Sequence, residues 1–119
     1  MTGLEHAIIG LKQALDTPRR HNMWRWLVRH RMSSVKEALT LEHSRAGEAW
    51  LAAREMTLAR ERDNLLRKLS TLGPSVLEDP DVEPVRLQLN RLVSDLEHHR
   101  QRLNDLIYDT VSLELGGEQ

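Results

Sequence analysis

Apolar residues recur through most of this chain at spacings of three and four, which is the period of one face of an α-helix. The longest such stretch, residues 34–72, corresponds to about ten turns at 3.6 residues per turn. Ser34, with Glu37 three positions later, fits a capping box, in which both side chains bind free backbone N–H groups at a helix start. Gly73 and Pro74, residue types that end helices, follow directly. The pattern therefore predicts one long helix over residues 34–72.

A second amphipathic stretch covers residues 85–115. Its seam repeats every four and three residues, as in a coiled coil, and consists of Val85, Leu89, Leu92, Leu96, His99, Leu103, Leu106 and Thr110. Between the two stretches, residues 73–84 contain three of the four prolines, which predicts a loop. Because a short loop joins antiparallel helices, we expect a hairpin in which Trp50, the main core filler, lies opposite Ile107.

Residues 1–33 predict a helical cap on this hairpin. The apolar positions of residues 3–16 form one narrow stripe. Thr17 followed by Pro18 is a typical helix start, so a second short helix should run to about Met32. The expected fold is all-α: a coiled-coil-like antiparallel hairpin of two long helices, capped by two short N-terminal helices within a single domain.

Some apolar side chains would stay uncovered on such a hairpin. They are Leu41, Leu58 and Leu65 on the first long helix, and Leu87 and Leu115 on the second. An exposed apolar patch on a narrow hairpin usually marks a partner surface. A second copy related by twofold symmetry is the simplest partner, so we expect a homodimer that completes a helical bundle.

Composition limits the possible classes of protein. The chain has 119 residues, the length of one domain, and it contains no cysteine, which excludes disulfides, thiolate catalysis and cysteine–zinc sites. No apolar run reaches the roughly 18 residues of a membrane span, and the start lacks the apolar core of a signal peptide. These features predict a cytoplasmic location.

The net charge of −1 hides an uneven distribution. Residues 1–36 hold seven Lys and Arg against two acids, whereas residues 73–119 hold four Arg against ten acids. The basic part can attract an acidic partner, or it can dock on the acidic part of the same chain or of a second copy. Docking within the chain would bring together two sets of charged residues, Arg25, Arg29 and Arg31 with Asp105, Asp109 and Glu114.

The basic-aromatic segment, residues 19–31, combines arginines with two tryptophans and contains no acid. Its candidate partner-binding residues are Arg19, Arg20, Trp24, Arg25, Trp26, Arg29 and Arg31. Such residues suit an acidic protein surface, or a nucleic acid through phosphate contacts and base stacking. An anionic membrane surface is a third alternative that we do not favour. Alternatively, Trp24 and Leu27 belong to the core and the arginines form a solvated face or pair with the acidic tail.

The histidines give only a partial metal-site pattern. Two motifs place carboxylates beside imidazoles, Glu42-His43 and Glu97-His98-His99. The Glu-x-x-His spacing of di-iron bundles is absent, because an arginine stands three residues after each of these glutamates. We therefore expect no metal and no other cofactor, and we expect His99 to be either a hydrogen-bonded core residue or a residue of a dimer interface.

No catalytic pattern is present in the sequence. The serines show no nucleophile-elbow motif, the glycines form no phosphate-binding loop, and a thin hairpin offers little concavity for a substrate. We predict a non-enzymatic helical protein–protein interaction module, such as an adaptor, a chaperone-like protein or an assembly factor. The alternatives are a nucleic-acid-binding protein that uses residues 19–36 and, with less support, a metal-binding helical bundle.

Overall fold

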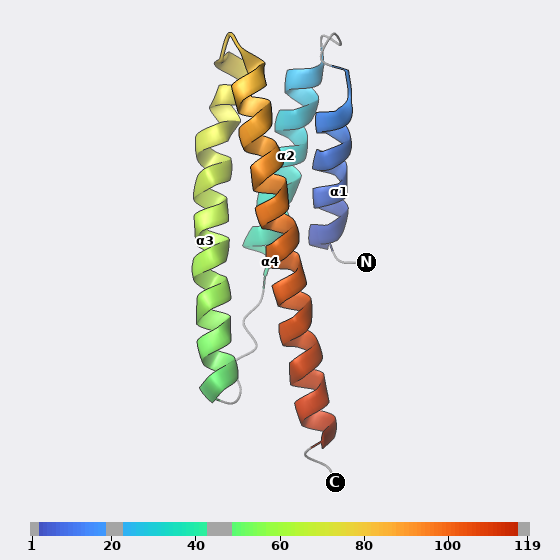
Figure 1. Ribbon diagram of the computed structural model, residues 1–119, viewed down its shortest axis with the longest axis vertical. Helices are drawn as coiled ribbons and strands as arrows, with labels where there is room; N and C mark the ends of the chain where they lie inside the picture. The colour runs from blue at the N-terminus through green and yellow to red at the C-terminus, as the bar shows by residue number, and fades with distance from the viewer. Residues whose placement is uncertain (1–2, 19–22, 43–48, 117–119) are drawn as a thin grey trace.

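The computed structural model describes residues 3–18, 23–42 and 49–116, with the side chains of residues 52–109, 111 and 112 in the last range. It contains helices α1 (Gly3–Asp16), α2 (Trp24–Thr40), α3 (Ala49–Glu78) and α4 (Val82–Gly116), shown in Figure 1. No strand occurs in these ranges, so the all-α class is confirmed.

The helices form a bundle in which each one packs against two others. α1 contacts α2 and α4, and α3 contacts the same two helices from the other side. α1 and α2 lie along the half of α3 and α4 that contains their connecting turn, and the rest of α3 and α4 extends beyond them (Figure 1). We call this two-helix extension, residues 52–59 of α3 and 103–112 of α4, the arm. The molecule is accordingly 60 Å long but only 23 and 19 Å across.

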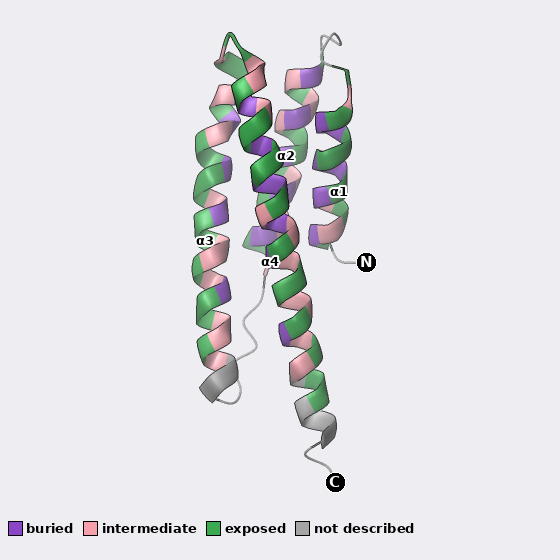
Figure 2. Ribbon diagram, in the orientation of Figure 1, coloured by how far each residue is buried: buried purple, intermediate pink, exposed green. Residues whose placement is uncertain are grey.

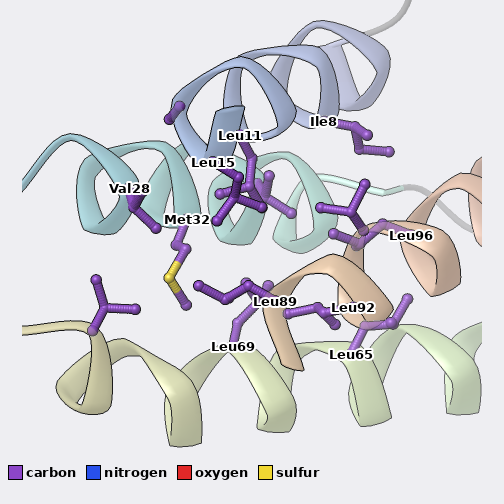
Figure 3. Close-up of a cluster of buried hydrophobic side chains, with 14 of the residues drawn as sticks. Ile8, Leu11, Leu15, Val28, Met32, Leu65, Leu69, Leu89, Leu92 and Leu96 are labelled. Carbon is purple, nitrogen blue, oxygen red and sulfur yellow. The ribbon is translucent and has the colours of Figure 1, made fainter. Parts of the chain in front are cut away.

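The main core lies where all four helices meet. Leu11 of α1, Met32 of α2, Leu65 of α3 and Leu92 of α4 converge there, together with their neighbours one turn away (Figure 3). Buried positions face inward along this half of the molecule (Figure 2). The arm has only a small cluster of its own, in which Leu58 and Leu106 pack with Leu103. Most of the buried apolar surface that stabilises the fold therefore lies in the four-helix half.

The prediction of one long helix over residues 34–72 is wrong, because α2 ends at Thr40 and α3 begins at Ala49. Ser34 lies inside α2 and does not begin a helix. The buried side chains of Val28, Met32, Val35 and Leu39 continue one apolar stripe through this point. The hydroxyl of Ser33 donates back to the Arg29 carbonyl, a bond that lets serine sit within a helix. Tertiary burial of the stripe thus outweighs the local capping signal.

The predicted loop over residues 73–84 is also wrong. α3 continues through Gly73 and Pro74 to Glu78, and α4 already starts at Val82, ahead of the expected residue 85. Val76 explains the continuation, because it extends the stripe of Leu65 and Leu69 and is completely buried. The energy gained by burying that stripe compensates for the hydrogen bond that proline removes from a helix.

The short turn between α3 and α4 is built by two aspartates. Asp79 Oδ1 accepts the backbone N–H of Asp81 at 3.2 Å, and Asp81 Oδ1 accepts the N–H of Glu83 in the first turn of α4 at 3.1 Å. Aspartate commonly supports turns and helix starts in this way. The acidic composition of the loop is thus explained by capping.

Three ion pairs set the register of α3 against α4. They are Arg54–Asp109 at 2.6 Å, Glu61–Arg102 at 2.6 Å and Lys68–Asp95 at 3.3 Å. The pairs recur every seven residues on both helices, and the sign of the α3 residue alternates. A slip of one heptad would therefore place like charges opposite each other. This register differs by more than one helical turn from the expected one, because α3 runs past Gly73.

The ladder of ion pairs makes one prediction for stability. Arg54→Asp should lower the free energy of unfolding by up to about 1 kcal/mol, because an acid then faces Asp109 on a half-exposed surface. The double variant Arg54→Asp/Asp109→Arg should recover most of that loss, as measured by urea unfolding. Arg60→Asp, an exposed position on the same helix, serves as the control. A double variant as unstable as the single one would contradict a specific pairing.

Candidate functional site

The structure divides the basic-aromatic segment between the core and the surface. Trp24 is only 2% exposed and packs in the main core, so it is not available to a partner. Its indole N–H finds no hydrogen-bond partner among the described residues. Arg19 and Arg20 lie outside the described residues. The alternative that Trp24 belongs to the core is therefore confirmed.

Arg25 caps the end of α3. Its Nη1 donates to the carbonyls of Asp79 at 2.6 Å and Val76 at 3.2 Å, and its Nη2 reaches the carbonyl of Pro80 at 3.4 Å. The last carbonyls of a helix lack partners within the helix and carry a partial negative charge. Arg25 thus supplies both hydrogen bonds and an opposite charge from a neighbouring helix, and it has a structural role at this position.

Two further arginines of α2 lie over glycines. The guanidinium of Arg29 comes within 3.0 Å of the position that a Cβ would take at Gly73, and the side chain of Arg31 comes within 3.3 Å of that position at Gly10. Arg29 Nη1 also donates to the hydroxyl of Ser33 at 2.8 Å. The absence of a side chain at each glycine lets α2 approach its neighbours on both sides.

The exposed remainder of the segment is an aromatic pair on the outer face of α2. Trp26 is 55% exposed, and its ring stacks on that of His30 with a centroid distance of 5.2 Å and an angle of 4°. Met23, also half exposed, precedes this pair. Of the candidate contact residues that the structure describes, Trp26 and Arg31 are therefore the ones most open to solvent.

The structure does not show the alternative in which Arg25, Arg29 and Arg31 dock on Asp105 and Asp109 of the same chain. Asp109 pairs with Arg54, Asp105 accepts a hydrogen bond from Gln101, and the side chain of Glu114 lies outside the described residues. The reason is the placement of α1 and α2, which cover the turn end of α3 and α4 and leave the arm bare.

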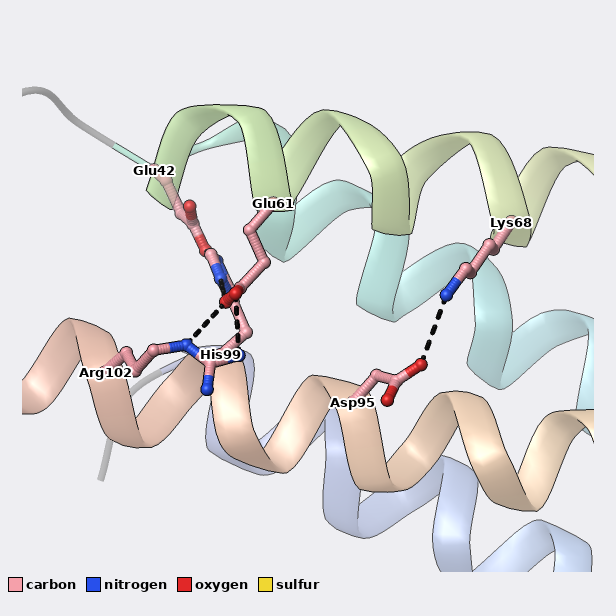
Figure 4. A network of polar contacts seen from close by, with 6 residues as sticks. All are labelled: Glu42, Glu61, Lys68, Asp95, His99 and Arg102. Atoms are coloured by element: carbon pink, nitrogen blue, oxygen red, sulfur yellow. Dashed lines mark hydrogen bonds and ion pairs between the residues drawn. The ribbon is translucent and has the colours of Figure 1, made fainter. Parts of the chain in front are cut away.

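A buried charged cluster joins three helices at the start of the arm. His99 of α4 is completely buried, its Nδ1 lies 2.6 Å from Glu61 Oε1 on α3, and its Nε2 lies 2.8 Å from Glu42 Oε1 just after α2 (Figure 4). Glu61 also accepts two hydrogen bonds from Arg102, at 3.1 and 2.6 Å. The expectation that His99 is a hydrogen-bonded core residue is confirmed.

Charge balance in this cluster favours a protonated His99. Both ring nitrogens face carboxylates, which only accept hydrogen bonds, so both must donate. Burial of the ring lowers the pKa of His99, but the hydrogen bonds and charges of Glu42 and Glu61 raise it by more, to above the ordinary value of 6.5. With His99 protonated, two positive and two negative side chains make the cluster neutral.

The cluster does not resemble a metal centre. The two ring nitrogens point to separate carboxylates, and within the described residues no group of three or more His, Cys, Asp or Glu is arranged to hold a metal ion. Sequence reasoning missed the partnership of Glu42 and Glu61 with His99. It assigned Glu42 to the middle of a long helix, and no local pattern singles out Glu61.

Comparisons with protein families, with curated proteins and with solved structures found no match for this chain. Over its described residues, the chain has no helix that is both long and apolar enough to span a membrane.

The cluster makes a prediction about pH. Because the pKa of His99 is raised in the folded state, its contribution to stability is complete below about pH 6.5 and is lost as the pH rises through the folded-state value. The free energy of unfolding, measured with urea from about pH 6 to about pH 9, should therefore fall with a slope of at most about 1.4 kcal/mol per pH unit.

Two variants and a control isolate this effect. His99→Gln should remove the decline, and Glu42→Gln should make it shallower, because one carboxylate no longer stabilises the imidazolium. Glu97→Gln, which affects an exposed pair with Lys12, should keep it. An unchanged pH dependence in His99→Gln would show that another group titrates in this range.

Proposed function

We propose that this chain is a non-enzymatic helical protein-interaction module that works in the cytoplasm as a homodimer, with the arm as the dimer interface. The main support is the bare arm. α1 and α2 do not cover it, and Met56, Tyr108 and Val111 on it are 58%, 72% and 45% exposed. Large apolar side chains gathered on one part of a soluble protein favour a partner surface.

The thinness of the arm also supports dimerisation. Leu58 and Leu106 are buried there between only two helices, and Ala59, Leu103 and Ile107 beside them are half buried. Two arms packed around a twofold axis would add two helices to each copy's two, the same number as in the main bundle. Such a dimer would cover the half-buried side chains and extend the small cluster into a full core.

A non-enzymatic role is supported by the burial of His99, the residue whose pKa is raised. His99 has no exposed surface, so a substrate could not reach it without separation of the helices. The Trp26–His30 pair offers a second apolar surface at the opposite end of the molecule from the arm. A module with two separate surfaces can join a second copy at one and a different protein at the other.

The dimer proposal is tested by light scattering at micromolar concentration. Wild-type protein should have about twice the monomer mass of 13.8 kDa, and Val111→Glu and Met56→Glu should each reduce it to the monomer mass, because a buried carboxylate would lack a partner in the interface.

Leu87→Glu is the matched control for this experiment. Leu87 is a similarly exposed apolar residue of α4, at 52%, but it lies near the turn, and its substitution should leave the mass unchanged. A monomeric wild type would reject the proposal, and a dimer broken only by Leu87→Glu would move the interface to the other end. Circular dichroism of each variant checks that the helices remain.

A further inference from the structure

A groove of about 410 Å³ runs between α3 and α4, and no residue of α1 or α2 lines it. Its floor is apolar and is formed by Leu72 of α3, which is half buried, and Leu92 of α4, which is 2% exposed. Charged side chains form both walls: Arg67 and Lys68 from α3, and Arg91 and Asp95 from α4. The groove thus combines an apolar base with an excess of positive charge.

Only one of the three cations in the groove is neutralised. Lys68 pairs with Asp95 at 3.3 Å (Figure 4). The exposed side chains of Arg67 and Arg91 stand on opposite walls, and within the described residues the structure records no ion pair for either. Two guanidinium groups that face one space repel each other. An anion placed between them would replace this repulsion with two attractive interactions.

The groove contrasts with the basic-aromatic segment, where an acidic partner was expected. There, Arg25 is bound to carbonyls of the chain and Arg29 lies against Gly73. Those contacts would have to break before either side chain could bind a partner. Binding a partner at Arg67 and Arg91 would break no side-chain hydrogen bond or ion pair that either residue makes with the described part of the chain.

We propose that this α3–α4 groove binds an acidic amphipathic helix of a partner protein. The space between two antiparallel helices is the place where a third helix packs, with its side chains between theirs. An apolar stripe would lie on Leu72 and Leu92, and glutamates on either side of the stripe would pair with Arg67 on one wall and Arg91 on the other. The inference rests on the proposed interaction-module function and adds a further binding surface to it.

A designed peptide tests the proposal without knowledge of the natural partner. The probe is a fluorescein-labelled helical peptide of about 21 residues with leucine at the a and d positions and glutamate at e and g, where like charges keep the peptide monomeric. Full-length protein should increase its anisotropy with a dissociation constant in the micromolar range. Glutamine in place of each glutamate should weaken binding at least about tenfold, which corresponds to about 1.4 kcal/mol.

Charge reversals on the protein locate the binding site. Arg67→Glu and Arg91→Glu should each weaken binding of the acidic peptide at least about tenfold. Lys36→Glu makes the same change of charge on an exposed residue of α2, a helix that does not line the groove, and should leave binding within about twofold. Both arginines are exposed, so the thermal unfolding of their variants should match that of wild type and show that folding is intact.

Several results would overturn the proposal. They are the absence of peptide binding, equal weakening by all three reversals, and a short DNA duplex that binds more tightly than the peptide and through the same arginines. The last result would assign the groove to nucleic acid. A dimer by light scattering that fails to bind the peptide would reject the groove and leave the proposed function standing. A monomer that binds the peptide would support the groove and reject the dimer.

Discussion

The contact of Arg25 with the end of α3 determines much of the rest of this structure. Its guanidinium binds carbonyls at Val76, Asp79 and Pro80, so α3 can end at Glu78 instead of at residue 72, where Gly73 and Pro74 would locally stop it. The later end moves the turn and shifts the register of α4 along α3. It also draws α2, and α1 with it, toward the turn, and this placement leaves the arm uncovered.

α2 is held at both ends by charges and in the middle by apolar packing. Arg25 fixes its start against α3, and Glu42, just past its end, binds the buried His99 of α4. Between these points, Val28, Met32 and Val35 enter the core. A buried ionic contact often adds little net stability, because desolvation offsets the attraction, but misplacing one partner is costly. The apolar stripe therefore supplies most of the energy, whereas the charged contacts select one position of α2.

The sequence predicted the helical class and the buried faces better than the ends of the helices. The seam of α4 from Val85 to Leu106 and the core position of His99 were read correctly, because burial repeats with the period of the helix itself. Ser34 and Gly73 gave false boundary signals, because serine and glycine are also tolerated inside a helix when tertiary packing favours it. Arg29 of α2 packs against Gly73, and helix propensities and capping patterns, which are local, cannot predict a contact between residues so far apart in sequence.

The same limitation explains why the basic-aromatic segment was overvalued as a contact surface. A run of arginines without acids marks an excess of positive charge, but it does not say whether carbonyl groups or glycine surfaces of the same chain already engage that charge. Arg25 and Arg29 meet such groups within the chain, although neither forms a salt bridge with a described acid. A search for ion pairs alone would therefore wrongly count Arg25 and Arg29 as available to a partner. A cation's contacts with backbone and small residues decide whether it holds the fold together or remains available for recognition.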